Sequence, residues 1–153
     1  MDGIAIAEQA AATPPLAWQA FLAMKPPSVT HNDLTVRKHP SGHHYIGKTD
    51  RLREAEDAIC ARIRTSAPEA AMGGKLRAKV TWCFPTRGRH QQGEPMDEVP
   101  DLDNLAKTFL DCLKTCGVIA DDAIVAEEHL TKVWSDPCGI FVRIEQIDPW
   151  RWQ

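Results

Sequence analysis

Between Leu76 and Phe84, apolar and polar residues alternate along the chain. A period of two is the pattern of a strand that buries one face, so this run predicts a strand over residues 76–84. Residues 102–116 instead repeat apolar side chains at steps of three and four, and Gly117 follows them. This pattern predicts an amphipathic helix that ends just before a glycine. The fold must therefore bury one apolar face of this strand and one apolar face of this helix.

Four further segments have helical or strand patterns. Residues 49–66 repeat apolar positions at helical spacing and predict another amphipathic helix. Residues 18–24, 124–134 and 140–147 predict strands, and the turn residues 135–139 predict that the last two strands form a hairpin. Four strands and two helices without βαβ alternation throughout indicate an α+β fold. We expect a single domain, in which a small mixed or antiparallel sheet of about four strands packs with two main helices.

Segments rich in proline and glycine separate these elements. Residues 29–48 and 85–100 contain several of these residues and predict loops. Residues 1–15 are rich in alanine and end in two prolines, so they predict a flexible N-terminal tail. The remaining residues, 16–153, are expected to form the folded domain.

The composition is typical of a soluble globular protein, because 43% of the 153 residues are hydrophobic and 25% are charged. No apolar run reaches the roughly 18 residues of a membrane helix, and the N-terminus lacks a basic signal start, so we expect a cytoplasmic protein. Five scattered cysteines without a Cys-x-x-Cys pair indicate free thiols rather than disulfides or a zinc site. Cys112 and Cys116 are one helical turn apart and leave a soft-metal pair as the alternative.

Positive and negative charges are concentrated in different halves of the chain. Residues 34–93 contain 12 Lys or Arg and 5 Asp or Glu, whereas residues 94–149 contain 4 and 13. One interpretation is that a basic surface binds phosphates while an acidic surface holds metal ions, and the other is that the two halves form salt bridges with each other. The candidates for contacts with a DNA backbone, each of which is also compatible with an ordinary surface charge, are Arg37, Lys38, Lys75, Arg77, Lys79, Arg87 and Arg89.

Two pairs of aspartates flank the helix predicted over residues 102–116. Asp101 and Asp103 stand at its start, and Asp121 and Asp122 follow its end. Four carboxylates brought together in a cleft would repel one another strongly unless a divalent cation neutralised them, and hard oxygen ligands suit Mg²⁺ or Mn²⁺. Lys107 lies one turn beyond Asp103 and adds a positive charge that can meet a phosphate. This combination predicts a metal-dependent phosphodiesterase.

Simpler roles for the same residues remain open. Asp103 can cap a helix, Asp111 can form a surface ion pair one turn from Lys107, and Asp121 and Asp122 can belong to a turn. A calcium-binding EF-hand loop is excluded, because its sixth and twelfth positions would be Ala106 and Cys112 instead of glycine and glutamate. These roles would make the chain a catalytically silent domain that binds DNA or another protein.

The segment Asp101-Leu102-Asp103-Asn104-Leu105-Ala106-Lys107, followed by Asp111, a glycine-ended helix and Asp121-Asp122, resembles the RusA family of Holliday junction resolvases. Pro26-Pro27-Ser28 is similar to another segment of that family. The resemblance implies that Asp101, Asp103 and Asp122 bind the metal and that Lys107 is the catalytic lysine. It also implies that Asn104 and Asp121 support the site.

The resemblance further implies a RusA-like domain over residues 16–153 that cuts DNA with Mg²⁺, for which Mn²⁺ is a possible substitute. Such an enzyme resolves four-way junctions in recombination and repair by paired, symmetric hydrolysis of phosphodiester bonds, and it acts as a homodimer. The alternatives are another structure-specific metal nuclease, acting on flaps or RNA–DNA hybrids, and the silent binding domain.

Overall fold

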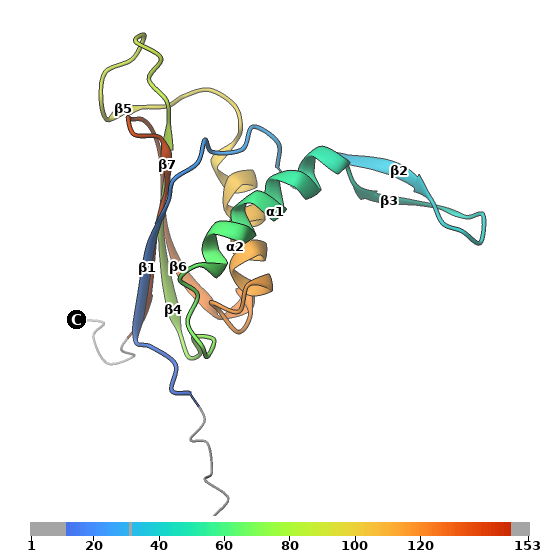
Figure 1. The fold of residues 1–153 in the computed structure, drawn as a ribbon, viewed down its shortest axis with the longest axis horizontal. Coiled ribbons are helices and arrows are strands. Elements are labelled where there is room, and N and C mark those ends of the chain that lie inside the picture. Colours follow the sequence, from blue (N-terminus) through green and yellow to red (C-terminus); the bar gives the residue numbers. More distant parts are fainter. Residues whose placement is uncertain (1–11, 31, 148–153) are drawn as a thin grey trace, which may run out of the picture.

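Two helices cover one face of a mixed five-stranded sheet, and a separate two-stranded ribbon projects away from them (Figure 1). The structure, a computed structural model, describes residues 12–30 and 32–147. The elements are β1 Ala17–Leu22, β2 Leu34–Lys38, β3 His44–Lys48, α1 Asp50–Arg64, β4 Leu76–Phe84, β5 Glu94–Pro95, α2 Leu102–Thr115, the 3₁₀ helix η1 Asp122–Ile124, β6 Val125–Trp134 and β7 Gly139–Gln146. The α+β fold is thus confirmed. The predicted tail, residues 1–15, lies mostly outside the described residues.

The central strand of the sheet is β4, in the order β1-β7-β4-β6-β5. It pairs antiparallel with β7 and parallel with β6. The predicted hairpin between the last two strands is therefore wrong, because β4 lies between them. Residues 135–138 can extend over about 13 Å, enough to cross the roughly 9.6 Å between strands two places apart in a sheet. Turn residues indicated correctly that the chain reverses there, but not which strand becomes its neighbour.

The predicted strand 76–84 and the predicted helix 102–116 form the centre of the core. The apolar side chains of β4 are buried, and Trp82 meets Phe109 of α2 edge to face, with 6.1 Å between ring centroids. After α2, Val118 donates its N–H to the carbonyl of Leu113 at 2.9 Å, and Gly117 adopts a φ of 74°. These contacts form the glycine-ended cap expected from the sequence.

The second predicted helix is α1, and it packs against α2. The Thr49 hydroxyl accepts the Leu52 N–H at 3.2 Å and caps the start of α1. All five cysteines are free, as predicted. The Cys112 and Cys116 thiols donate to main-chain carbonyls of α1, and burial raises the pKa of Cys116 to about 12. Both thiols thus take part in the contact with α1.

The loop predicted over residues 29–48 is wrong, because most of it forms the antiparallel ribbon of β2 and β3. The ribbon is fastened to the start of α1, since Arg37 Nη2 lies 2.6 Å from Asp50 Oδ1. The region predicted as a loop over residues 85–100 contains the two-residue strand β5. No helix in the described ranges is long and apolar enough to cross a lipid bilayer.

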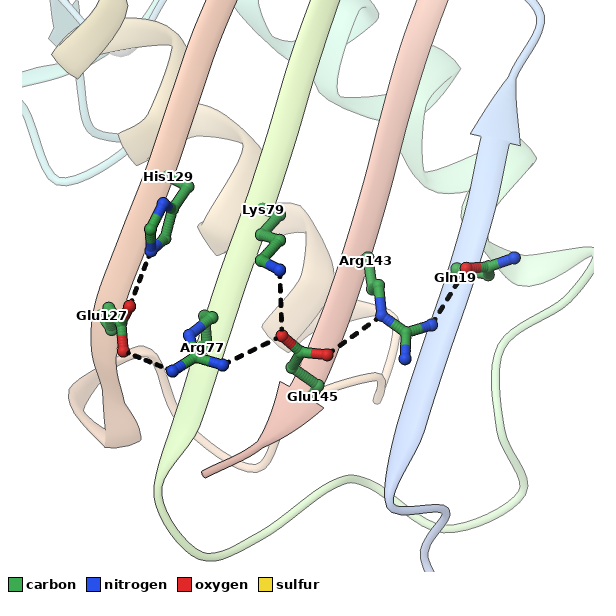
Figure 2. Close-up of polar contacts among 7 residues, drawn as sticks. All are labelled: Gln19, Arg77, Lys79, Glu127, His129, Arg143 and Glu145. Carbon is green, nitrogen blue, oxygen red and sulfur yellow. Dashed lines mark hydrogen bonds and ion pairs between the residues drawn. The ribbon is translucent and has the colours of Figure 1, made fainter. Parts of the chain in front are cut away.

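The sheet face turned away from the helices carries a network of charged side chains (Figure 2). Arg77 pairs with Glu127 at 2.9 Å and with Glu145 at 3.1 Å. Lys79 and Arg143 also contact Glu145. Hydrogen bonds to Arg77 lower the pKa of both glutamates to about 2. The network joins residues of the basic half of the chain to residues of the acidic half.

Arg77→Met should weaken the dependence of stability on acid pH. A glutamate pKa lowered from 4.5 to about 2 contributes stability that is complete above pH 4.5 and is lost as the pH falls toward 2. Without Arg77, the free energy of unfolding should therefore fall less between pH 6 and pH 3, as measured by urea denaturation. Arg53→Met, which removes an exposed charge from α1, is the control. Equal pH dependence in wild type and Arg77→Met would contradict this role.

Candidate active site

The first acidic pair lies at the exposed start of α2. Asp101 is the N-cap residue, and its main-chain carbonyl accepts the Leu105 N–H at 3.0 Å. The Asp101 carboxylate makes no capping hydrogen bond. Asp103 lies in the first helical turn, where the helix dipole favours negative charge. The alternative in which Asp103 caps the helix is wrong, since Asp101 holds that position.

Lys107 connects α2 to the segment that carries the second acidic pair. Its Nζ lies 3.2 Å from Asp111 Oδ1 and 3.5 Å from Asp122 Oδ2. The hydrogen bond that Lys107 donates to Asp111 raises the pKa of Lys107, and Asp122 adds to the effect. The Lys107 side chain is still 49% exposed. The Lys107 ammonium group is therefore oriented by two carboxylates and remains accessible to solvent.

Each aspartate of the second acidic pair forms an ion pair with a different lysine of α2. Asp122 faces Lys107, and Asp121 Oδ1 lies 3.1 Å from Lys114 Nζ. Contact with Asp122 and the ion pair with Lys114 lower the pKa of Asp121 to about 2. Asp121 is thus an anion at neutral pH and forms an ion pair with Lys114.

Main-chain hydrogen bonds to Met72 fix the position of the second acidic pair, Asp121 and Asp122, along α2. Met72 donates its N–H to the Val118 carbonyl at 2.8 Å, and Ala120 donates to the Met72 carbonyl at 3.0 Å. Val118, Ile119 and Met72 are buried in the core. These contacts fix the segment after α2 just before Asp121. Asp122 therefore lies beside α2, within reach of Lys107.

The structure brings together Lys107, Asp111 and Asp122, and it leaves Asp101 and Asp103 about one turn or more toward the start of α2. Within residues 12–30 and 32–147, no three His, Cys, Asp or Glu side chains are grouped closely enough to hold a metal ion. Asn104 is half-buried, and its main-chain carbonyl accepts a hydrogen bond from the Thr108 hydroxyl at 3.1 Å. The Asp111–Lys107 ion pair expected from helical spacing is present.

The family model described as Endodeoxyribonuclease RusA matches residues 25–145. The chain belongs to the RusA family. A search of the curated proteins finds no match. The matched residues contain both acidic pairs, Lys107, strands β4, β5 and β6 and all but the last residue of β7. The match therefore extends over most of this RusA-family chain.

Lys132 is a residue of this RusA-family site that the sequence did not reveal. Its Nζ donates to the Glu98 carbonyl at 2.7 Å and to the Pro100 carbonyl at 2.8 Å. Lys132 pairs in register with the buried Trp82, so its side chain leaves β6 on the helix-covered face. Every residue has a main-chain carbonyl, so the sequence does not indicate which carbonyls a lysine in a strand will bind. Lys132 holds the segment from which Asp101 enters α2.

The seven basic candidates do not share one surface in this RusA-family protein. Arg37 pairs with Asp50 on the ribbon, and Arg77 and Lys79 pair with carboxylates on the open sheet face. For Arg77 and Lys79, the alternative of salt bridges between the two halves of the chain is realised, whereas Asp50, the partner of Arg37, belongs to the same half as Arg37. The four that form no ion pair with any described residue are exposed, and they are Lys38, Lys75, Arg87 and Arg89.

Lys132→Met should loosen the entry to α2. The variant loses two hydrogen bonds from a charged donor, each of which contributes roughly 1.5–3 kcal/mol. Amide hydrogen exchange in residues 98–103 should then accelerate by about tenfold or more, as measured by mass spectrometry. Lys38→Met, on the ribbon, is the control and should leave these amides unchanged. Unaltered protection of residues 98–103 in Lys132→Met would show that Lys132 does not position Asp101.

Proposed function

We propose that this protein is a metal-dependent endodeoxyribonuclease that resolves four-way DNA junctions in recombination and repair. The observation that supports this proposal best is the contact of Lys107 with Asp111 and Asp122, because it joins the two parts of the acidic motif across 15 residues of sequence. The chain belongs to the RusA family of endodeoxyribonucleases, and this family supplies the reaction class, which is cleavage of DNA.

The proposed metal ligands are Asp101, Asp103 and Asp122. Their carboxylates are exposed or partly exposed and provide hard oxygen atoms, so the donor chemistry fits Mg²⁺ or Mn²⁺. When bound, the cation would lower the pKa of a water molecule and balance charge on the leaving oxygen.

Lys107 is the proposed phosphate ligand. Asp111 holds its ammonium group at 3.2 Å, the shorter of its two ion pairs, so Lys107 stays oriented if Asp122 is engaged elsewhere. An exposed ammonium in this position can donate hydrogen bonds to the non-bridging oxygens of the scissile phosphate. It would stabilise the negative charge that develops there in the transition state.

The proposal predicts paired, symmetric nicks in a synthetic four-way junction with Mg²⁺, and little cutting of linear duplex. Asp103→Asn should lower this cutting by roughly 100-fold or more, because several kcal/mol of charge stabilisation depend on the ligand set. The measurement is the rate of nicking on a gel, with junction affinity measured in parallel. Affinity should survive, since the fold is unchanged.

Asp111→Asn is the matched control for this experiment, since it makes the same substitution on the same helix. It removes a partly exposed partner of Lys107, so cutting should fall by less than about tenfold, as expected for a surface ion pair. Near-normal nicking by Asp103→Asn would overturn the assigned site. Efficient cutting of flaps or RNA–DNA hybrids instead of junctions would assign a different substrate to the same residues.

Symmetric cutting of two strands calls for two active sites, so we also propose a two-fold homodimer. Light scattering at the concentration of the cutting assay should give twice the mass of one chain. Dilution below the dissociation constant of the dimer should turn paired nicks into single nicks. A strict monomer that cuts both strands in concert would contradict this part of the proposal.

A further inference from the structure

A pocket of about 150 Å³ opens directly before the residues that enter α2. Its lining includes Phe84, the last residue of β4, and Pro100, just before α2. Figure 1 shows that β4 ends and α2 begins at the same end of the sheet. The buried part of its lining is apolar and consists of Pro26, Phe84, Met96, Pro100 and Trp134. Pro100 is the neighbour of Asp101, so the two Cα atoms are within about 4 Å of each other. One wall of the pocket is therefore adjacent in the chain to the proposed metal ligand Asp101.

The aromatic floor of the pocket is held rigidly. The Trp134 ring stacks on His90 with 3.9 Å between centroids and 3° between planes. Phe84 meets the same ring edge to face at 6.3 Å, and Glu94 holds His90 at 3.1 Å. A cavity of about 150 Å³ accommodates a benzene-sized ring. The floor thus offers a preformed apolar space for one flat ring.

The rim of the pocket is polar and includes two cations. Lys25, Ser28, Arg87 and Glu98 line it and are exposed, and the side chains of Lys25 and Arg87 form no ion pair with any described residue. Apolar space beneath a rim that carries these two cations beside Glu98 matches the two parts of a nucleotide, which are a flat base and a phosphate.

Arg87 is placed by a strained turn. Its φ of 54° is rarely adopted by residues other than glycine, and Gly88 follows with a φ of 69°. Arg89 closes the turn by donating its N–H to the Thr86 carbonyl at 3.0 Å. Thr86 in turn donates its N–H and hydroxyl to the carboxylate of Asp136. Strain that is maintained by neighbouring contacts is typical of ligand-binding segments.

We propose that this pocket receives one unstacked base of the DNA strand being cut, next to the scissile phosphate, while Lys25 and Arg87 bind an adjacent phosphate. The inference rests on the proposed function and adds a subsite to it. Stacking is interrupted at a branch point, so a base there leaves the helix at a lower cost than a base within continuous duplex. Base capture would position the strand against Asp101 and Lys107.

The test is an abasic scan, in which each of a series of four-way junctions lacks one base near the branch point. Affinity is measured by fluorescence anisotropy without Mg²⁺, so no cutting is needed. Wild type should lose about fivefold to hundredfold in affinity at one position of the cut strand, the range measured for removing the aromatic partner of a stacked base. Ser28→Trp should fill the pocket and show no sensitive position.

Matched variants separate pocket filling from other effects. Val99→Trp introduces the same side chain from another exposed lining residue and should behave like Ser28→Trp, so the test does not depend on one variant folding. Ala61→Trp, at an exposed position of α1, should keep the wild-type profile. Arg87→Gly, chosen because glycine tolerates the positive φ, should weaken binding of every junction while keeping the sensitive position.

The outcomes distinguish this inference from the proposed function. If wild type cuts the intact junction but its abasic profile is flat, or if the folded tryptophan variants keep the wild-type profile, the base subsite is overturned and the nuclease assignment stands. If wild type neither binds nor cuts any junction, the proposed function is overturned and the subsite with it. A single sensitive position that disappears in Ser28→Trp or Val99→Trp supports the subsite.

Discussion

Parallel pairing of β4 with β6 is the constraint on which the candidate site depends. Two neighbouring parallel strands require a crossover connection, and α2 is that connection. The chain must therefore enter α2 at one end of the sheet and leave it at the other. The first acidic pair lies at the entry and the second follows the exit, so both flank one helix. Lys107, between them on the exposed side of α2, can reach the second pair because of this topology.

The elements predicted well are those that bury one face in the core. Strand 76–84 and both helices have strong periodicity because each alternates between solvent and the same apolar layer. The ribbon of β2 and β3 buries little, and Val36 and Ile46 are 65% and 74% exposed, so its strands lack the contrast that reveals a buried face. The neighbour of β6 is decided by packing across the whole sheet, which local turn residues do not encode.

The same distinction applies to the site. The aspartates, Lys107 and the Lys107–Asp111 pair could be predicted, since they lie in one motif or at helical spacing. The contact of Lys107 with Asp122 spans 15 residues and depends on the buried anchor at Met72. Lys132 binds main-chain carbonyls, and the pocket at Trp134 draws its walls from four separate segments. Features that the tertiary fold assembles leave no periodic signal in the sequence.

Charge pairing across the sheet also restricts where DNA can bind. On the open face, Arg77, Lys79 and Arg143 share the carboxylates of Glu127 and Glu145, so a phosphate there would have to compete with ion pairs already formed. Lys25 and Arg87 face no such competitor among the described residues, and they lie beside Pro100 at the entry to α2. Of the 12 Lys and Arg in residues 34–93, four form ion pairs with described residues, and they are Arg37, Lys48, Arg77 and Lys79. Lys25 and Arg87 beside the start of α2, which pair with no described residue, therefore favour approach of the strand there rather than across the ion pairs of the open sheet face.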